Sequence, residues 1–397
     1  MNRSKALIAC FLSAVPSLAV SQTIGPVMRV VDVTWPNEPP ITSASAEKTI
    51  SDLNVPLMPV LLPPTFLTDK LPAFTAEPLS YTAYVWAESE IASITGTRIA
   101  ADLGDTHSTG EPTMLSSSGE SQAEATMVLY GVAYTLTVEC NDAANPRCAD
   151  DAYARGLLES AVLVGGSRGA PPPLPPTPVA EPPMAGASVA GFDFRPAGQL
   201  AAGAGTGVKS EIVYAPGIRF PIEKAPAYLN SQVWGIGGYF GPRPTAARPF
   251  SANFRYPWQD TFCEKRDYKT PACPSGFGHQ GVDIRAGDGR KSVYWAVAAE
   301  AGRIHKIGTY SVVLVGDSGT QYTYLHLNRE KLVVERGQRV MRGHRIGLVS
   351  DEFGRDKFGK RKPTTVHLHF EIRQNLNGRG LTVVSPFMSL VRAYQAM

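Results

Sequence analysis

A proline-dominated segment near the middle of the chain constrains the architecture more than any other feature. Eight of the thirteen residues from Pro171 to Pro183 are proline, a density that excludes helix and sheet and favours a stiff polyproline II spacer. The following stretch from Ala197 to Gly207 is rich in small residues. We therefore predict a linker over residues 167–208 that separates two folded parts, and a chain of 397 residues is long enough for both.

The part before this linker is predicted to contain a small α+β domain at residues 79–166. The residues from Tyr81 to Trp86 alternate like a strand, and Met127 to Val138 is rich in β-forming residues. From Asp150 to Val164 the apolar residues recur at helical spacing. Residues 22–78 have many prolines and few periodic stretches, so we expect an extended or loosely ordered arm.

The N-terminus has the layout of a secretion signal. A basic segment, Met1 to Lys5, precedes an apolar run that is too short to span a membrane. Small residues at Ala19 and Ser21 predict a signal peptide at residues 1–21 that is cleaved before Gln22. Lipoprotein processing at Cys10 is the alternative. We expect a periplasmic or secreted protein with no transmembrane segment after signal cleavage.

Cysteine usage agrees with export. Without Cys10, four cysteines remain, and they lie in two close pairs. This predicts two local disulfides, Cys140–Cys148 and Cys263–Cys273. A Cys/His metal site is the competing interpretation, but neither pair has C-x2-C spacing and neither adjoins a histidine.

The part after the linker, residues 209–397, favours a mainly β domain. Two β-forming runs, Val312 to Val315 and Thr320 to Leu327, flank a Gly-Asp-Ser-Gly turn and predict a hairpin. A helix is predicted only from Pro386 to Gln395. The net charge of +3 gives no support for a nucleic-acid partner, because such partners require a concentrated basic surface.

Histidines gather in this β domain. His279 and Asp283 are four residues apart beside a glycine, and imidazole nitrogen and carboxylate oxygen are both ordinary zinc ligands. In the run from Val366 to Ile372, strand alternation puts the apolar residues on one face and His367 and His369 on the other. Two histidines about 6.5 Å apart on one face can reach a single metal ion. Both could bind it, or one could bind while the other handles a proton.

His326 supplies a further candidate at the end of a predicted strand. The alternation of Tyr322, Tyr324 and His326 puts these three side chains on one face. We expect His326 to lie beside the histidine strand if the two strands are neighbours.

Taken together, these motifs resemble those of the M23 peptidases, also called the LytM or lysostaphin-like family of peptidoglycan endopeptidases. The resemblance covers roughly Val233 to Ile372, about a third of the chain. The matching stretches are Tyr239-Phe240-Gly241-Pro242-Arg243, Gly278-His279-Gln280-Gly281-Val282-Asp283-Ile284, Tyr324-Leu325-His326-Leu327, the Gly337/Val340/Gly343/Ile346/Gly347 spacing and His367-Leu368-His369-Phe370.

The resemblance implies a mainly antiparallel β domain that binds one Zn²⁺ and acts on peptidoglycan. It implies that His279, Asp283 and His369 hold the metal and that His326 and His367 are catalytic. Three protein ligands leave one position for water, as catalytic zinc requires. His367 is then expected to be the general base and His326 to stabilise the oxyanion.

Two inserts depart from the family pattern, and two other functions stay open. A longer segment lies between Arg243 and His279, and a charged loop runs from Asp351 to Lys362. Both inserts could shape substrate specificity. The first alternative function is a catalytically inactive LytM-like wall-binding protein that activates another cell-wall hydrolase. The second is a closed structural zinc site with His367 as the fourth ligand. The sequence does not define the bond that is cut or the oligomeric state.

Overall fold

The computed structural model describes residues 25–41, 53–67, 72–87, 89–104, 114–142, 144–176, 189–355, 358 and 360–397. The predicted signal peptide, its cleavage site and Cys10 lie outside these residues. The proline-rich segment is described only in part, because residues 177–188 are outside them. None of the helices in the described ranges is long and apolar enough to cross a membrane.

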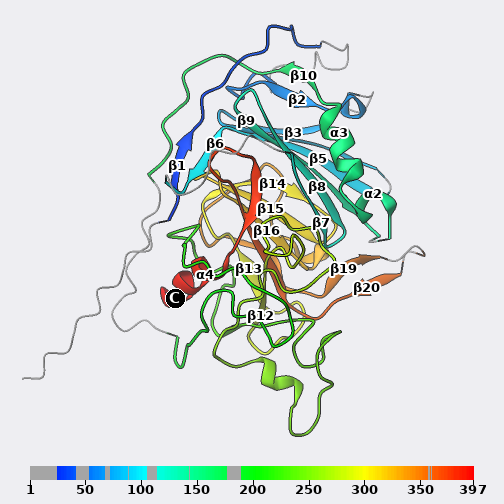
Figure 1. Ribbon diagram of the computed structural model, residues 1–397, viewed down its shortest axis with the longest axis vertical. Coiled ribbons are helices and arrows are strands. Elements are labelled where there is room, and N and C mark those ends of the chain that lie inside the picture. The colour runs from blue at the N-terminus through cyan, green and yellow to red at the C-terminus, as the bar shows by residue number, and fades with distance from the viewer. Residues whose placement is uncertain are drawn as a thin grey trace, which may run out of the picture.

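The N-terminal half is built on an antiparallel sheet of six strands in the order β3-β4-β5-β9-β8-β7. Its strands are β3 (Ala73–Glu77), β4 (Ser80–Trp86), β5 (Glu90–Thr97), β7 (Leu115–Gly119), β8 (Gln122–Leu129) and β9 (Val132–Cys140). Two helices, α2 (Pro146–Ala149) and α3 (Ala152–Glu159), pack against β8 and β9. Figure 1 shows this half above the C-terminal half, with the helices at its outer side.

The described parts of the proline-rich arm, residues 25–41, 53–67 and 72–78, form strands that pair within this half of the molecule. They contribute β3 to the sheet, while β1 (Val27–Val30) pairs with β6 (Ile99–Asp102) and β2 (Val60–Leu62) pairs with β10 (Val162–Gly165). These strands have three to five residues, which is too short for sequence periodicity to reveal them. The boundary between arm and domain at residue 78 stays a prediction.

The helix expected over residues 150–164 is shorter than its sequence pattern. Helix α3 ends at Glu159, and Val162 begins strand β10 instead. The Val-Leu-Val sequence there finds a partner in the buried strand β2, which lies about a hundred residues earlier in the chain. Tertiary pairing therefore overrides the helical spacing of Ala161 and Val164.

The C-terminal half is built on an antiparallel sheet in the order β11-β12-β21-β16-β15-β14-β17, with β22 also paired to β21. Its strands are β11 (Ala227–Leu229), β12 (Val282–Ala286), β14 (Gly302–Ile307), β15 (Ser311–Gly316), β16 (Gln321–Leu325), β17 (Arg339–Val340), β21 (Leu368–Asn375) and β22 (Leu381–Val384). The predicted hairpin is confirmed as β15–β16 and the predicted last helix as α4 (Phe387–Gln395). The mainly antiparallel β fold expected of this region is thus confirmed.

Two short strand pairs complete the C-terminal half. They are β13 (Trp295–Val297) with β18 (Arg345–Leu348), and β19 (Glu352–Arg355) with β20 (Arg361–Pro363). The β19–β20 hairpin is formed by the charged loop that departs from the family pattern, and it projects from the body of the molecule (Figure 1). Both predicted disulfides, Cys140–Cys148 and Cys263–Cys273, are present.

Each half has its own hydrophobic core. The buried apolar residues form one cluster between Leu53 and Val164 and a second between Ala197 and Tyr394, with no residue in common. Residues 189–208, expected to be part of a linker, lie against the C-terminal half: Ala197 and Ala204 are buried, and the Gly198 amide donates to Asp260 at 2.9 Å.

Candidate metal centre

The sheet brings three predicted metal ligands together through the pairing of two strands. Strand β12 pairs antiparallel with β21 so that Asp283 lies opposite His369. His279 precedes β12, and its backbone amide and carbonyl bond to Glu264 and Cys263, the latter part of a disulfide. All three side chains are buried, with exposures of 0–2%.

Three side-chain atoms of this group converge on one point. His279 Nε2 lies 2.8 Å from His369 Nδ1, and Asp283 Oδ1 lies 3.2 Å from each of these nitrogens. Ligands at 2.0–2.1 Å in a tetrahedral zinc site are separated by about 3.3 Å. The spacing of the three donor atoms therefore fits a single zinc ion.

The other ring nitrogens of the two histidines are already occupied. His279 Nδ1 donates to the Thr261 carbonyl at 2.8 Å, and His369 Nε2 donates to Glu371 Oε1 at 3.0 Å. Glu371 in turn accepts from Arg373 at 2.8 Å. These bonds fix which nitrogen of each imidazole faces the centre. Histidines that bind metals in proteins usually donate their other ring N–H to a carbonyl or carboxylate in this way.

Burial and hydrogen bonding set the charges of this group. Burial opposes a charge on His369, but its bonds to Asp283 and Glu371 outweigh that effect and raise its pKa to about 10. Burial also opposes a charge on Asp283, yet the neighbouring His279 and the hydrogen bonds from His279 and His369 hold its pKa well below the usual value. The Asp283 carboxylate is thus ionised and the His369 imidazole is protonated. A metal ion that binds to both groups can take the place of the proton on His369.

The two predicted catalytic histidines lie on one side of this centre. His367 Nδ1 donates to the Thr365 carbonyl at 2.7 Å, which leaves Nε2 as an acceptor 3.4 Å from Asp283 Oδ1. His326 Nδ1 donates to the Glu352 carbonyl at 2.7 Å, and the His326 and His367 rings are 4.5 Å apart. Burial lowers the pKa of His367 to about 4 and that of His326 well below its usual value, so both rings are neutral.

His326 reaches the site by a different route from the one its sequence pattern predicts. Tyr322 and Tyr324 pack on Phe370, on the apolar face of the sheet, so strand alternation would direct His326 to that same face. The expectation that the three share a face is wrong. His326 has a φ of 65°, a left-handed conformation that only a few per cent of non-glycine residues adopt. This turn of the backbone carries its ring across to His367 and His369.

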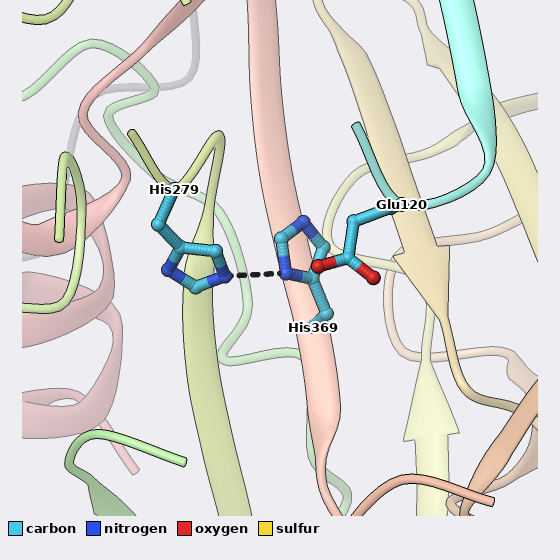
Figure 2. Close-up of side chains that lie close together, drawn as sticks. All are labelled: Glu120, His279 and His369. Atoms are coloured by element: carbon cyan, nitrogen blue, oxygen red, sulfur yellow. Dashed lines mark hydrogen bonds between the residues drawn. The ribbon is translucent and has the colours of Figure 1, made fainter. Parts of the chain in front are cut away.

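A fourth candidate ligand comes from the N-terminal half, and the sequence analysis did not predict it. One ligand atom each of Glu120, His279 and His369 lie within 4.8 Å of one another. Figure 2 shows the Glu120 carboxylate beside the His369 ring, at the end of a turn that enters the site from the side away from His279. A lone glutamate in a polar turn carries no sequence signal, because only the docking of the two halves brings it to the histidines.

Comparison with known proteins supports the assignment of the C-terminal region. Residues 277–381 match the family model "Peptidase family M23". No curated protein sequence matches the chain.

Among solved structures, the matches include a lytM protein of Ruminococcus gnavus (25% identity, TM-score 0.26, 29% of this chain and 47% of that one). Lysostaphin of Staphylococcus simulans matches at 24% identity and a TM-score of 0.23, over 30% of this chain and 45% of that one. Pseudoalterin, a deep-sea M23 metalloprotease, matches at 21% identity and a TM-score of 0.22, over 28% and 60%. In each case the match spans less than two thirds of the other protein.

The matched segment contains His279, Asp283, His326, His367 and His369, and it includes the strands β12, β16 and β21 beside which they lie. Residues 277–381 of this chain are therefore similar to the M23 peptidases.

Proposed function

We propose that this protein is a zinc-dependent endopeptidase that hydrolyses peptide cross-links or stem peptides of bacterial peptidoglycan, in the periplasm or outside the cell. The convergence of His279 Nε2, Asp283 Oδ1 and His369 Nδ1 at 2.8–3.2 Å carries the proposal. His279, Asp283 and His369 would hold the zinc ion. A bound zinc ion supplies an activated water and polarises the scissile carbonyl.

His367 is the better placed of the two remaining histidines to accept a proton. Its Nδ1–H is committed to the Thr365 carbonyl, so the lone pair of Nε2 faces the centre. A neutral ring with a free lone pair is what a general base requires. The imidazolium formed by accepting the proton can then donate it to the leaving amine.

His326 is oriented in the same way, by its bond to the Glu352 carbonyl. Its Nε2 is therefore an acceptor in the neutral ring and becomes a donor only after it gains a proton. We assign His326 to stabilise the oxyanion as an imidazolium. Burial opposes that charge in this closed structure, so the role requires the ring to take up a proton once solvent or substrate reaches it. The stacking of Tyr310 on its ring, at 5.9 Å and 6° between planes, holds it in position.

Two alternatives are less well supported. An inactive wall-binding relative would not need all five of these side chains, whereas each of them faces the centre here. A closed structural site with His367 as fourth ligand would leave no position for water at the centre, and the His367 and His369 variants described below distinguish it from an open site.

The test is digestion of purified sacculi by the full chain with stoichiometric zinc. We expect fragments with new amino and carboxyl termini in their peptides, identified by mass spectrometry, while the glycan bonds stay intact: cleavage of stems releases free peptides, and cleavage of cross-links releases glycan chains that still carry their stems. Chelation with EDTA should stop the release, and added zinc should restore it. If neither the wild-type chain nor any variant described below releases such fragments, the peptidase function is rejected.

A further inference from the structure

A loop of the C-terminal half exposes three large aromatic side chains. It comprises residues 233–255, which lie between β11 and β12 in the sequence and contain one short helix, η2 (Phe250–Asn253); we call it the aromatic loop. Tyr239 exposes 87% of its surface, Phe240 55% and Phe250 40%. Figure 1 shows the loop in yellow-green, at the end of the molecule away from the N-terminal half. A group of exposed aromatic residues indicates a binding surface.

The exposed rings are in contact and form one surface. The centroids of the Trp234 and Phe240 rings are 5.0 Å apart with 30° between the planes, and those of Tyr239 and Phe240 are 4.8 Å apart at 81°. One face of a pyranose sugar consists of C–H bonds, and it packs on the negative face of an aromatic ring. The surface formed by Tyr239 and Phe240 is suited to such sugars.

This surface is better matched to a sugar than to a protein. Each aromatic side chain offers about 150–250 Å², so two exposed rings offer less than the roughly 800 Å² that each partner of a stable protein interface buries. All the large apolar side chains that the loop exposes are aromatic. Flat rings without exposed aliphatic neighbours fit the flat faces of sugars.

The backbone of the aromatic loop is held in shape by its own hydrogen bonds. The side chain of Asn253 accepts from the Ile236 N–H at 3.2 Å and donates to the Ile236 carbonyl at 2.8 Å. The Phe240 N–H donates to the Val233 carbonyl at 2.7 Å. A surface that is fixed before binding loses little conformational entropy when a ligand arrives.

The first end of the loop is joined to the candidate metal centre by hydrogen bonds. Gln232 directly precedes the loop, and its Oε1 accepts from the Thr365 hydroxyl at 2.6 Å. The carbonyl of the same threonine accepts from His367 Nδ1 at 2.7 Å. The loop therefore begins next to the proposed general base.

The second end of the loop packs on the strand that carries a proposed metal ligand. Arg285 on β12 is two residues after Asp283, and its guanidinium lies 5.3 Å from the Phe250 ring centre and 5.7 Å from that of Phe254. Cations pack favourably on aromatic faces, so the loop and β12 hold one another in position. The aromatic loop thus borders the centre at both of its ends.

The aromatic loop carries positive charge only. Between Glu223 and Asp260 the chain has no acidic residue, and the loop contains Arg243, Arg248 and Arg255, all of them exposed. A surface of one sign attracts polymers of the opposite sign. The stem peptides of peptidoglycan carry free carboxylates along the glycan, so the charge of the loop complements this polymer.

We propose that the aromatic loop is a saccharide-binding surface for the glycan strand of peptidoglycan, with sugar rings packed on Tyr239 and Phe240. The three arginines attract the carboxylates of the attached stems. A glycan held there keeps its stem peptides beside the metal centre. The identity of the polymer rests on the proposed function, whereas the saccharide surface rests on the loop itself.

The test measures binding by the full chain in EDTA, so that hydrolysis does not contribute. The probes are purified sacculi, in a cosedimentation assay, and short soluble oligomers of N-acetylglucosamine, by calorimetric titration. A double variant with Tyr239→Ala and Phe240→Ala removes both exposed rings, and Tyr239→Phe keeps a ring at the first position. Trp86→Ala is the matched control, because it removes a ring that is 56% exposed on β4 of the N-terminal half.

For the double variant we expect the affinity for both probes to fall about tenfold or more, because two aromatic contacts are lost. Tyr239→Phe and Trp86→Ala should bind both probes as the wild-type chain does. At saturating zinc, the double variant should need a higher concentration of sacculi to reach half its maximal rate of fragment release, which is a rise in KM.

Four other outcomes have distinct meanings. Wild-type affinity of the double variant for both probes would overturn the proposal. Binding of sacculi but not of the oligomers by the wild-type chain would overturn the saccharide assignment in favour of the stem peptides, and binding of neither would overturn it in favour of a protein partner. Loss of oligomer binding in the double variant, with no fragment release by any chain in zinc, would support the saccharide surface and reject the peptidase function alone.

Discussion

At the scale of single residues, two histidines separated by one position have different surroundings. His369 is held between Asp283 and the Glu371 carboxylate, and His367 is held by the Thr365 carbonyl at the edge of the centre. The first arrangement orients a metal ligand and the second leaves a basic nitrogen free.

We predict that the roles of these two residues can be separated by mutation. His369→Ala should lose zinc and activity together, because it removes a ligand. His367→Ala should keep its zinc and lose about 10²- to 10⁴-fold in turnover, because the general base is gone. Zinc stoichiometry and fragment release from sacculi are measured on both. Equal loss of zinc in the two variants would instead support a closed structural site.

At the scale of elements, the close approach of β12 and β21 sets the position of the metal ligands. Gly281 lies between His279 and Asp283, and a Cβ atom there would come within 2.5 Å of the Phe370 carbonyl and 2.8 Å of His369 Nε2. The strands can pair at this distance only because the residue is glycine.

We therefore predict that Gly281→Ala pushes His369 out of line and weakens zinc binding by at least tenfold. The free energy of unfolding should fall by about 1–3 kcal/mol, as for other overpacked sites. The control is Gly156→Ala in α3, where nothing lies within 4 Å of the added atom, and it should stabilise by about 0.5–1 kcal/mol. Titration with zinc and denaturant melts compare the two. Wild-type zinc affinity in Gly281→Ala would contradict this view of the strand pair.

At the scale of the whole molecule, docking of the two halves buries ionisable groups between the sheets. His305 on β14 is 1% exposed, and its Nδ1 bonds the Thr82 hydroxyl of the other half at 2.7 Å. Burial, with a smaller contribution from Arg303, lowers its pKa from 6.5 to about 3. The folded, docked state therefore resists protonation of His305, while the unfolded or separated state does not.

The contribution of His305 to the free energy of unfolding is fully present above pH 6.5. It is lost as the pH falls toward 3, because only the unfolded or separated state takes up the proton. Between pH 7 and pH 5 the loss is about 2 kcal/mol. We predict that His305→Gln reduces the pH dependence of the unfolding free energy by that amount in denaturant melts at the two pH values. An identical pH dependence in both proteins would show that His305 is not protected by docking.

Much of the C-terminal half could be predicted from the sequence. The β15–β16 hairpin, α4, the Cys263–Cys273 disulfide and the strand that carries His369 follow from local patterns, since turn residues, cysteine spacing and side-chain alternation act over a few residues. Strand β21 begins at Leu368, so His367 lies just before it and not within it as the alternation predicts. The same local patterns made His279 and Asp283 candidates four residues apart.

Only the tertiary structure decided the rest, because it depends on segments far apart in the chain. Short strands such as β2 are too short to show a periodic pattern in the sequence, and they form because a distant strand pairs with them. His326 reaches the site through a single left-handed residue that alternation cannot foresee. Glu120 lies about 160 residues before His279 and is brought to it by the docking of two separate cores. The sequence by itself made His279, Asp283 and His369 candidates for metal binding, and the fold determined that Glu120 of the other half lies beside two of them.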